Sequence, residues 1–96
     1  MSKYATSVRF LVKEGELDAF INEVKALPNC GELYSQWYKA GDLTIAVNSI
    51  FESEQALLDA RPKMIENLNQ LRHRLQETSP ELGVTDPVSG PIFDEK

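Results

Sequence analysis

The hydrophobic residues of this chain repeat every two positions in some segments and every three to four in others, and the order of these segments constrains the fold. Residues 4–12 alternate in the manner of a half-buried strand. The two faces of that strand would carry Tyr4, Thr6, Val8, Phe10 and Val12 on one side and Ala5, Ser7, Arg9 and Leu11 on the other. From Leu17 to Leu27 the apolar residues take helical spacing. We therefore expect a strand followed by an amphipathic helix that Pro28 ends.

Three further strands are expected. Residues 31–39 and 43–51 are rich in β-forming residues. Because only the turn-like residues 40–42 separate them, they should form an antiparallel hairpin. A short fourth strand is expected near residues 82–85.

The second helical region contains a proline. Ser53 is a good N-cap for a helix that begins directly after it. Pro62 interrupts the helical pattern, so we expect a short helix near 54–60 and a longer one from Arg61. Residues 78–80, Thr-Ser-Pro, should end the longer helix.

The resulting order, βαββαβ, predicts a ferredoxin-like α+β fold, with a four-stranded antiparallel sheet covered by helices on one face. The other face would be bare in a single chain, although its residues are partly apolar and aromatic. Such a face is commonly buried against a symmetry mate, so we expect a homodimer. We assign residues 1–85 to this domain and residues 86–96 to an acidic C-terminal arm of the same domain, which should contact the second subunit.

Length and charge exclude several classes of function. The chain has 96 residues, the size of one domain, and a net charge of −5. Its acidic excess lies in residues 77–96. The negative balance argues against nucleic acid and against an anionic membrane surface as partners. No apolar run approaches the about 20 residues of a membrane span, and the single cysteine, Cys30, precludes an intrachain disulfide. We expect a cytoplasmic protein.

Two stretches carry a resemblance to a known family. SVRFLVKEGELDAFINEVKAL (7–27) and TIAVNSIFESEQALLDARP (44–62) resemble the first strand and helix, and the third strand and following helix, of the antibiotic-biosynthesis-monooxygenase-like families. The resemblance implies a dimeric α/β barrel with a pocket between sheet and helices or inside the barrel. It also implies cofactor-independent oxidation of quinols or aromatic polyketides. Phe51 stands where those families commonly have tryptophan.

The haem-degrading branch of the superfamily fits this chain poorly. That branch needs an asparagine in the first strand, and residues 4–12 contain none. It also needs a Trp/His pair in the following helix, where this chain has Ala60 and Gln70. We expect neither a bound cofactor nor a metal, since one histidine and one cysteine cannot supply a standard zinc site.

Five residues are candidates for binding a small aromatic ligand: Arg9, Tyr34, Trp37, Asn48 and Phe51. Arg9 could hold a carboxylate or phenolate, or pair with an acidic residue of the partner or of the arm. Tyr34 and Trp37 could stack on an aromatic ring or anchor the dimer. Asn48 could bond to its neighbours or to a ligand.

No residue is assigned as catalytic, and His73 and Arg72 are the candidates. His73 could act as a general base, or it could be a surface histidine. Whether the chain is an enzyme stays open at this point. The alternatives to a monooxygenase are a non-catalytic ligand-binding or structural homodimer, and an isomerase or lyase of the same superfamily with His73 as base.

Overall fold

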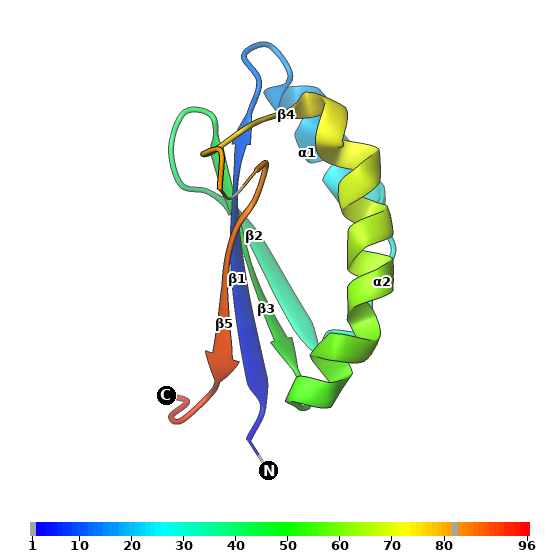
Figure 1. The fold of residues 1–96 in the computed structure, drawn as a ribbon, viewed down its shortest axis with the longest axis vertical. Coiled ribbons are helices and arrows are strands. Elements are labelled where there is room, and N and C mark those ends of the chain that lie inside the picture. The colour runs from blue at the N-terminus through cyan, green and yellow to red at the C-terminus, as the bar shows by residue number, and fades with distance from the viewer. Residues whose placement is uncertain (1, 82) are drawn as a thin grey trace.

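The computed structural model describes residues 2–81 and 83–96 and contains one antiparallel sheet and two α-helices (Figure 1). Their order confirms the predicted ferredoxin-like α+β fold, although the sheet formed by the described residues has five strands rather than the four expected. The elements are β1 (Tyr4–Val12), α1 (Leu17–Ala26), β2 (Tyr34–Lys39), β3 (Thr44–Phe51), α2 (Glu54–Leu71), the 3₁₀ helix η1 (Arg72–Arg74), β4 (Leu75–Gln76) and β5 (Asp86–Pro91). Within the described residues, no helix is both long and apolar enough to cross a membrane.

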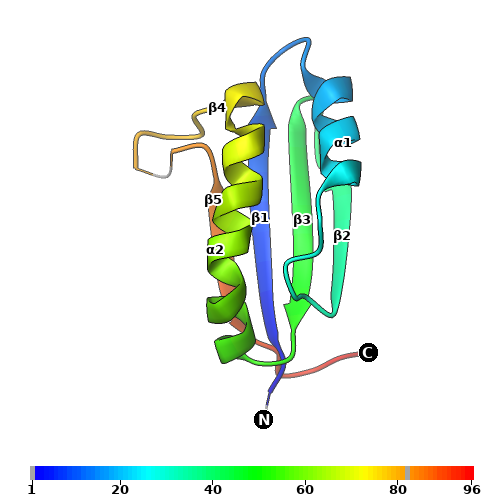
Figure 2. The same cartoon turned by 90° about the vertical axis from the view of Figure 1, so that its right-hand side faces the viewer.

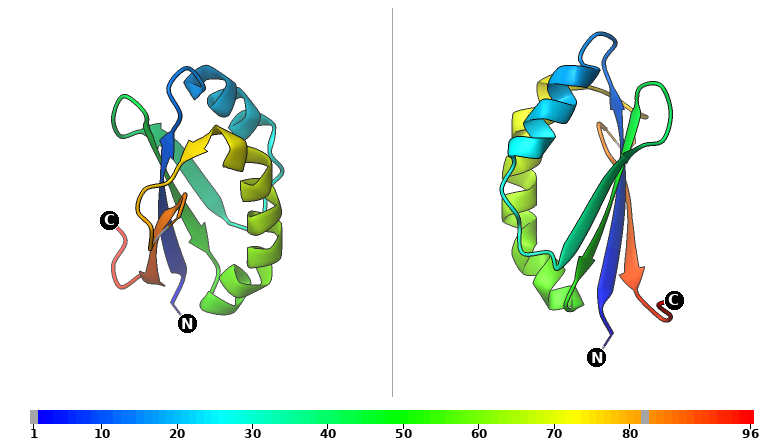
Figure 3. Two further views of the ribbon diagram at one scale, coloured as in Figure 1. Left: turned by 45° about the horizontal axis from the view of Figure 1, so that its top comes forward. Right: turned by 180° about the vertical axis from the view of Figure 1, so that it is seen from behind.

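Strand β1 lies at the centre of the sheet and pairs along both of its edges. One edge pairs with β3, which in turn pairs with β2. The other edge pairs with β5 along residues 4–9 and with β4 at residues 11–12. Both helices lie on the same side of this sheet (Figure 3), so its second face is bare in the single chain.

The core lies between the sheet and the helices. It forms because the alternating residues of β1 and β3 direct Phe10, Val12, Ile45 and Val47 towards α1 and α2. Phe20 of α1, Leu71 of α2 and Leu75 of β4 complete this cluster, and all three are almost fully buried. Figure 2 looks onto the helices and shows α2 running along β1, with β5 on one side of it and β2 on the other.

The helical region after β3 is one continuous helix that ends at Leu71, so both the predicted break at Pro62 and the predicted end at residues 78–80 are wrong. Ser53 caps the helix as expected, since its hydroxyl accepts a hydrogen bond from the Ala56 amide at 3.1 Å. Leu57 and Ala60 before the proline and Leu71 after it are buried. Packing on both sides of Pro62 therefore offsets the backbone hydrogen bond that its missing N–H removes.

The strand expected at residues 82–85 is found elsewhere. Leu82 lies outside the described residues, Gly83 forms only an isolated bridge with Ser79, and the strand β5 begins at Asp86. Two prolines lie in β5, and an edge strand tolerates proline where its nitrogen faces away from the partner. The Ile92 amide donates to the Lys3 carbonyl at 2.9 Å. Because backbone hydrogen bonds alternate along an antiparallel pair, the even-numbered residues of this segment are those that bond to β1. Pro87 and Pro91 are odd-numbered, so their nitrogens face away from β1. Contact of the arm with a second subunit stays a prediction.

Replacing Pro62 with alanine should stabilise the protein. The change restores an amide donor inside a continuous helix at an exposed position, and we expect the free energy of unfolding to rise by about 1–3 kcal/mol. Urea denaturation measures it, with the neighbouring Lys63→Ala as control. A lower midpoint for Pro62→Ala would show that the helix needs the proline.

Candidate functional site

A cavity of about 300 Å³ lies between the helix-facing side of the sheet and the helices, and we call it the β2-side cavity. Its apolar walls come from the sheet, from α1 and from α2. They include Val8 and Phe10 of β1, Trp37 of β2, Val47 and Phe51 of β3, and Met64, Leu68 and Leu71 of α2. The linker between α1 and β2 forms part of the lining, through residues 27–30 and Glu32. A mainly apolar concave site of this size suits a small organic ligand.

Trp37 gives this cavity a flat aromatic surface. Its ring stacks on that of Phe10, with centroids 5.8 Å apart and planes at 11°. The stacking fixes the indole against the core, while 39% of the residue stays exposed. An aromatic ligand could therefore pack against a surface that is already ordered.

Two serine hydroxyls point into the same cavity from neighbouring strands. Ser35 and Ser49 are directly opposite each other in the β2–β3 register, and their Oγ atoms are 2.7 Å apart. A hydroxyl has one donor and two acceptor positions, so the pair keeps hydrogen-bonding capacity for a ligand. Alternation along β2 and β3 places these serines on the same face as Trp37 and Phe51. That alternation is the sequence signal by which they could have been found.

Asn67 of α2 is a second polar group of the cavity that the sequence pattern alone did not single out. It is only 8% exposed, and its amide nitrogen donates to the Pro28 carbonyl at 3.3 Å and to Cys30 Sγ at 3.1 Å. Its Oδ1 has no hydrogen-bond partner among the described residues. Asn67 lies three residues after Met64 and four before Leu71. That spacing on the apolar stripe is a signal that it would be buried.

The linker between α1 and β2 brings a thiol and a carboxylate to the rim of the cavity. The Glu32 carboxylate accepts hydrogen bonds from Asn29 Nδ2 at 3.0 Å and from the Cys30 amide at 3.1 Å. Burial, followed by the charge of Glu32, raises the pKa of the Cys30 thiol. Cys30 is therefore protonated at neutral pH, and a protonated thiol is a poor nucleophile.

The predicted ligand-binding residues lie on two different faces of the sheet. Trp37 and Phe51 line the β2-side cavity. Arg9, Tyr34 and Asn48 point to the opposite, open face, because they occupy the alternate positions of their strands. The five residues are therefore not brought together within one chain.

On the open face, two of these residues have partners in the chain itself. Arg9 forms an ion pair with Asp86 of β5, which is one of the partners considered for it above. Asn48 Oδ1 accepts a hydrogen bond from the Ser7 hydroxyl at 2.7 Å. Tyr34 is 54% exposed. These contacts do not test the predicted role of the three residues in ligand binding, and none of the three lines the β2-side cavity.

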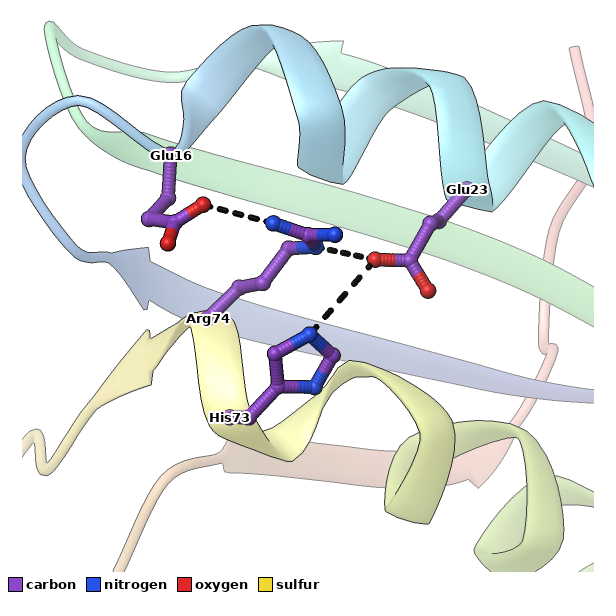
Figure 4. A network of polar contacts seen from close by, with 4 residues as sticks. All are labelled: Glu16, Glu23, His73 and Arg74. Atoms are coloured by element: carbon purple, nitrogen blue, oxygen red, sulfur yellow. Dashed lines mark hydrogen bonds and ion pairs between the residues drawn. The ribbon is translucent and has the colours of Figure 1, made fainter.

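The candidate catalytic residues lie away from the β2-side cavity. His73 Nε2 is 3.9 Å from Glu23 Oε1 of α1 (Figure 4). The same carboxylate forms an ion pair with Arg74, whose Nη1 also lies 2.6 Å from Glu16 Oε2. These contacts raise the pKa of Arg74, chiefly through its hydrogen bond to Glu23, and they tie η1 to α1. Arg72 Nε donates to Asn69 Oδ1 at 3.3 Å.

Within the described part of the chain, no three metal-ligating side chains gather into a group that could hold a metal ion.

Comparison with known proteins identifies the fold. No protein-family model and no curated protein matches the chain. Among solved structures, a dimeric ferredoxin-like protein from an uncultured marine organism matches with a TM-score of 0.76 and 11% identity, over 100% of this chain and 92% of that one.

Two further solved structures are named for an activity. A protein from Chloroflexus aurantiacus, described as a candidate antibiotic biosynthesis monooxygenase, matches with a TM-score of 0.72 and 13% identity, over 99% of this chain and 97% of that one. The cofactor-independent oxygenase SnoaB from Streptomyces nogalater, crystallised as a mutant, matches with a TM-score of 0.71, 11% identity and the same coverage. The predicted resemblance is thereby confirmed at the level of the fold.

Removing the charge of Glu32 should make Cys30 more reactive. Glu32→Gln lowers the thiol pKa, so more thiolate is present at pH 8 and alkylation by iodoacetamide should accelerate by about two- to fivefold. Mass spectrometry follows the adduct, with the exposed Glu52→Gln as the matched control. An unchanged rate would show that Glu32 does not act on the thiol.

Proposed function

We propose that the β2-side cavity binds a small aromatic molecule of the quinol type and that the function of the protein depends on this ligand. The observation that carries the proposal is the combination of an ordered aromatic wall, Trp37 stacked on Phe10, with the partly buried hydroxyl pair of Ser35 and Ser49. A phenolic ring needs an apolar, flat surface and a hydrogen-bonding group at one edge. The cavity supplies both.

We propose oxidation of the bound ligand by O₂ as the reaction. In an activated ring system such as an anthrone, a CH₂ group becomes a carbonyl, one oxygen atom enters the product and the other leaves as water with the two hydrogens. The substrate supplies all the electrons, so no bound redox group is required. The similarity in fold to SnoaB and to the Chloroflexus protein supports this class of reaction.

The lining of the cavity restricts which substrates it can oxidise. Among its described lining residues, Glu32 is the single acidic residue, and no histidine, tyrosine, lysine or arginine is present. A substrate that must lose a proton before it reacts with O₂ would receive little help from strong bases. The cavity therefore suits an anthrone or quinol that is itself acidic.

The same observation favours a second candidate, binding without turnover. A cavity with hydroxyl and amide groups but few titratable ones can hold a phenol without transforming it. The isomerase or lyase alternative requires His73 as base, and His73 lies outside this cavity.

We further propose that the protein is a homodimer formed through the open face of the sheet. Tyr34 and Tyr38 of β2 and Val88 of β5 are large side chains on this face, and each is about half exposed or more. Tyrosine is enriched in protein interfaces, and burial of this face would close two sheets into a barrel. The dimeric ferredoxin-like relative supports the proposal.

Replacing Ser49 should weaken ligand binding, whereas replacing its neighbour Asn48 should not. The two residues are adjacent in β3 but face opposite sides of the sheet, so they are a matched pair. Loss of the Ser49 hydroxyl should reduce the affinity for an anthraquinone about five- to tenfold. Quenching of Trp37 fluorescence measures it, because this is the only tryptophan of the chain. The reverse result would place the ligand on the open face.

Oxygen uptake separates oxidation from binding alone. With dithranol as substrate, the wild-type protein should consume O₂ faster than buffer, and Ser49→Ala should reduce that rate while Asn48→Ala should not. Binding without uptake would leave the ligand-binding candidate. Absence of both across a panel of quinols and anthrones would refute the proposed function.

A charge on the open face should dissociate the dimer. In sedimentation velocity at micromolar concentration, we expect a dimer for the wild type and a monomer for Tyr38→Glu, since the introduced carboxylate would have to be buried. Leu58→Glu is the control, because Leu58 is similarly exposed but lies on α2. A wild-type monomer, or a dimer for Tyr38→Glu, would contradict the proposed interface.

A further inference from the structure

A second cavity, of about 440 Å³, lies on the other side of α2, and we call it the β5-side cavity. Its lining combines residues of α2 and β1 with Thr85 and the first half of β5. From α2 these are Leu57, Arg61, Met64, Ile65 and Leu68, and from residues 85–89 they are Thr85, Pro87, Val88 and Ser89. Helix α2 therefore contributes lining residues to both cavities. Figure 2 shows this helix running along β1, between β5 and β2.

The two cavities share part of their lining. Thr6, Val8 and Phe10 of β1 and Met64 and Leu68 of α2 line both. Met64 and Leu68 are only partly buried, and methionine in particular adapts its shape to a neighbour at small cost. The division between the cavities therefore consists of a few apolar side chains that a ligand could displace.

Arg61 is the single charged residue among the described residues that line the β5-side cavity. None of its described lining residues is acidic, and no carboxylate lies within ion-pairing distance of Arg61 among the described residues. Arg9 and Arg74 have such partners, and Arg72 donates to Asn69 Oδ1 but does not line this cavity. A guanidinium beside an apolar hollow, without a carboxylate of its own, is suited to an organic anion.

We propose that the ligand extends beneath α2 from the β2-side cavity into the β5-side cavity and carries a carboxylate that pairs with Arg61. This inference rests on the proposed function, since it takes the aromatic end of the ligand to lie against Trp37. It narrows the ligand to an elongated aromatic acid. A ligand confined to the β2-side cavity does not reach Arg61, because Arg61 lines only the other one.

Two anthraquinones that differ in one group test the proposal. Rhein has a carboxylate where aloe-emodin has a hydroxymethyl group, and isothermal titration calorimetry gives the affinity of each. We expect the wild-type protein to bind rhein about tenfold more tightly. Arg61→Gln should remove that difference without changing the affinity for aloe-emodin, and Arg61→Lys should retain part of it. Lys63→Gln, which removes a charge from the same helix outside both cavities, should keep the preference.

A second variant guards against a general effect of changing Arg61. Ile65→Glu places a carboxylate in the β5-side cavity, and this variant should bind rhein more weakly than the wild type but bind aloe-emodin with unchanged affinity. Equal affinity of the two compounds for the wild type, or an equal loss of both in Arg61→Gln, would overturn the proposal and leave the proposed function intact. Failure of both compounds to bind would refute the aromatic ligand itself. A change in the dimer equilibrium in Arg61→Gln, with unchanged ligand preference, would overturn the proposal by assigning Arg61 to subunit contacts instead.

Discussion

Strand β1 is the element on which the rest of the structure depends, because it pairs along both edges and its alternation divides the sheet into two faces. Phe10 and Val12 face the helices and join the buried core, while Ser7 and Arg9 face the open side. The register then determines which residues of β3 and β5 lie on each face, because residues opposite each other on paired strands point to the same face. A shift of one residue in β1 would exchange the two faces, so the register determines which residues can reach the β2-side cavity.

The sequence predicts most of the elements but not the assignment of faces. Strand β1 and helix α1 match the predicted segments closely, because nine residues that alternate as in a strand, followed by a regular helical stripe, indicate only one order of elements. Alternation places Trp37 on the same face of β2 as Ser35, and Asn48 on the same face of β3 as Ile50. It does not tell which face of each strand is directed towards the helices, because both faces carry apolar residues. For this reason the candidate ligand residues come from both faces. Local propensity predicts a break at Pro62, and packing on either side of the proline overrides it.

The chemistry of the β2-side cavity is that of hydroxyl and amide groups rather than strong bases. Ser35, Ser49 and Asn67 offer hydrogen bonds from inside an apolar wall, and Glu32 is the carboxylate among the described lining residues. Under the proposed function, such a site would recognise a phenol by shape and hydrogen bonding, and the reaction would draw on the reactivity of the ligand itself. The Glu16–Glu23–Arg74 contacts, in contrast, hold η1 against α1, and His73 Nε2 lies 3.9 Å from the same Glu23 carboxylate. The proposed route to Arg61 adds a cationic group, and no arginine or lysine is among the described lining residues of the β2-side cavity.

The location of the ligand is the central claim, and intermolecular nuclear Overhauser effects test it most directly. In a complex of the protein with an anthraquinone, the ring protons of the ligand should show contacts to the Met64 methyl group and to the Trp37 indole, both of which line the β2-side cavity. Contacts to the rings of Tyr34 and Tyr38, without any to Met64, would place the ligand on the open face and contradict the account.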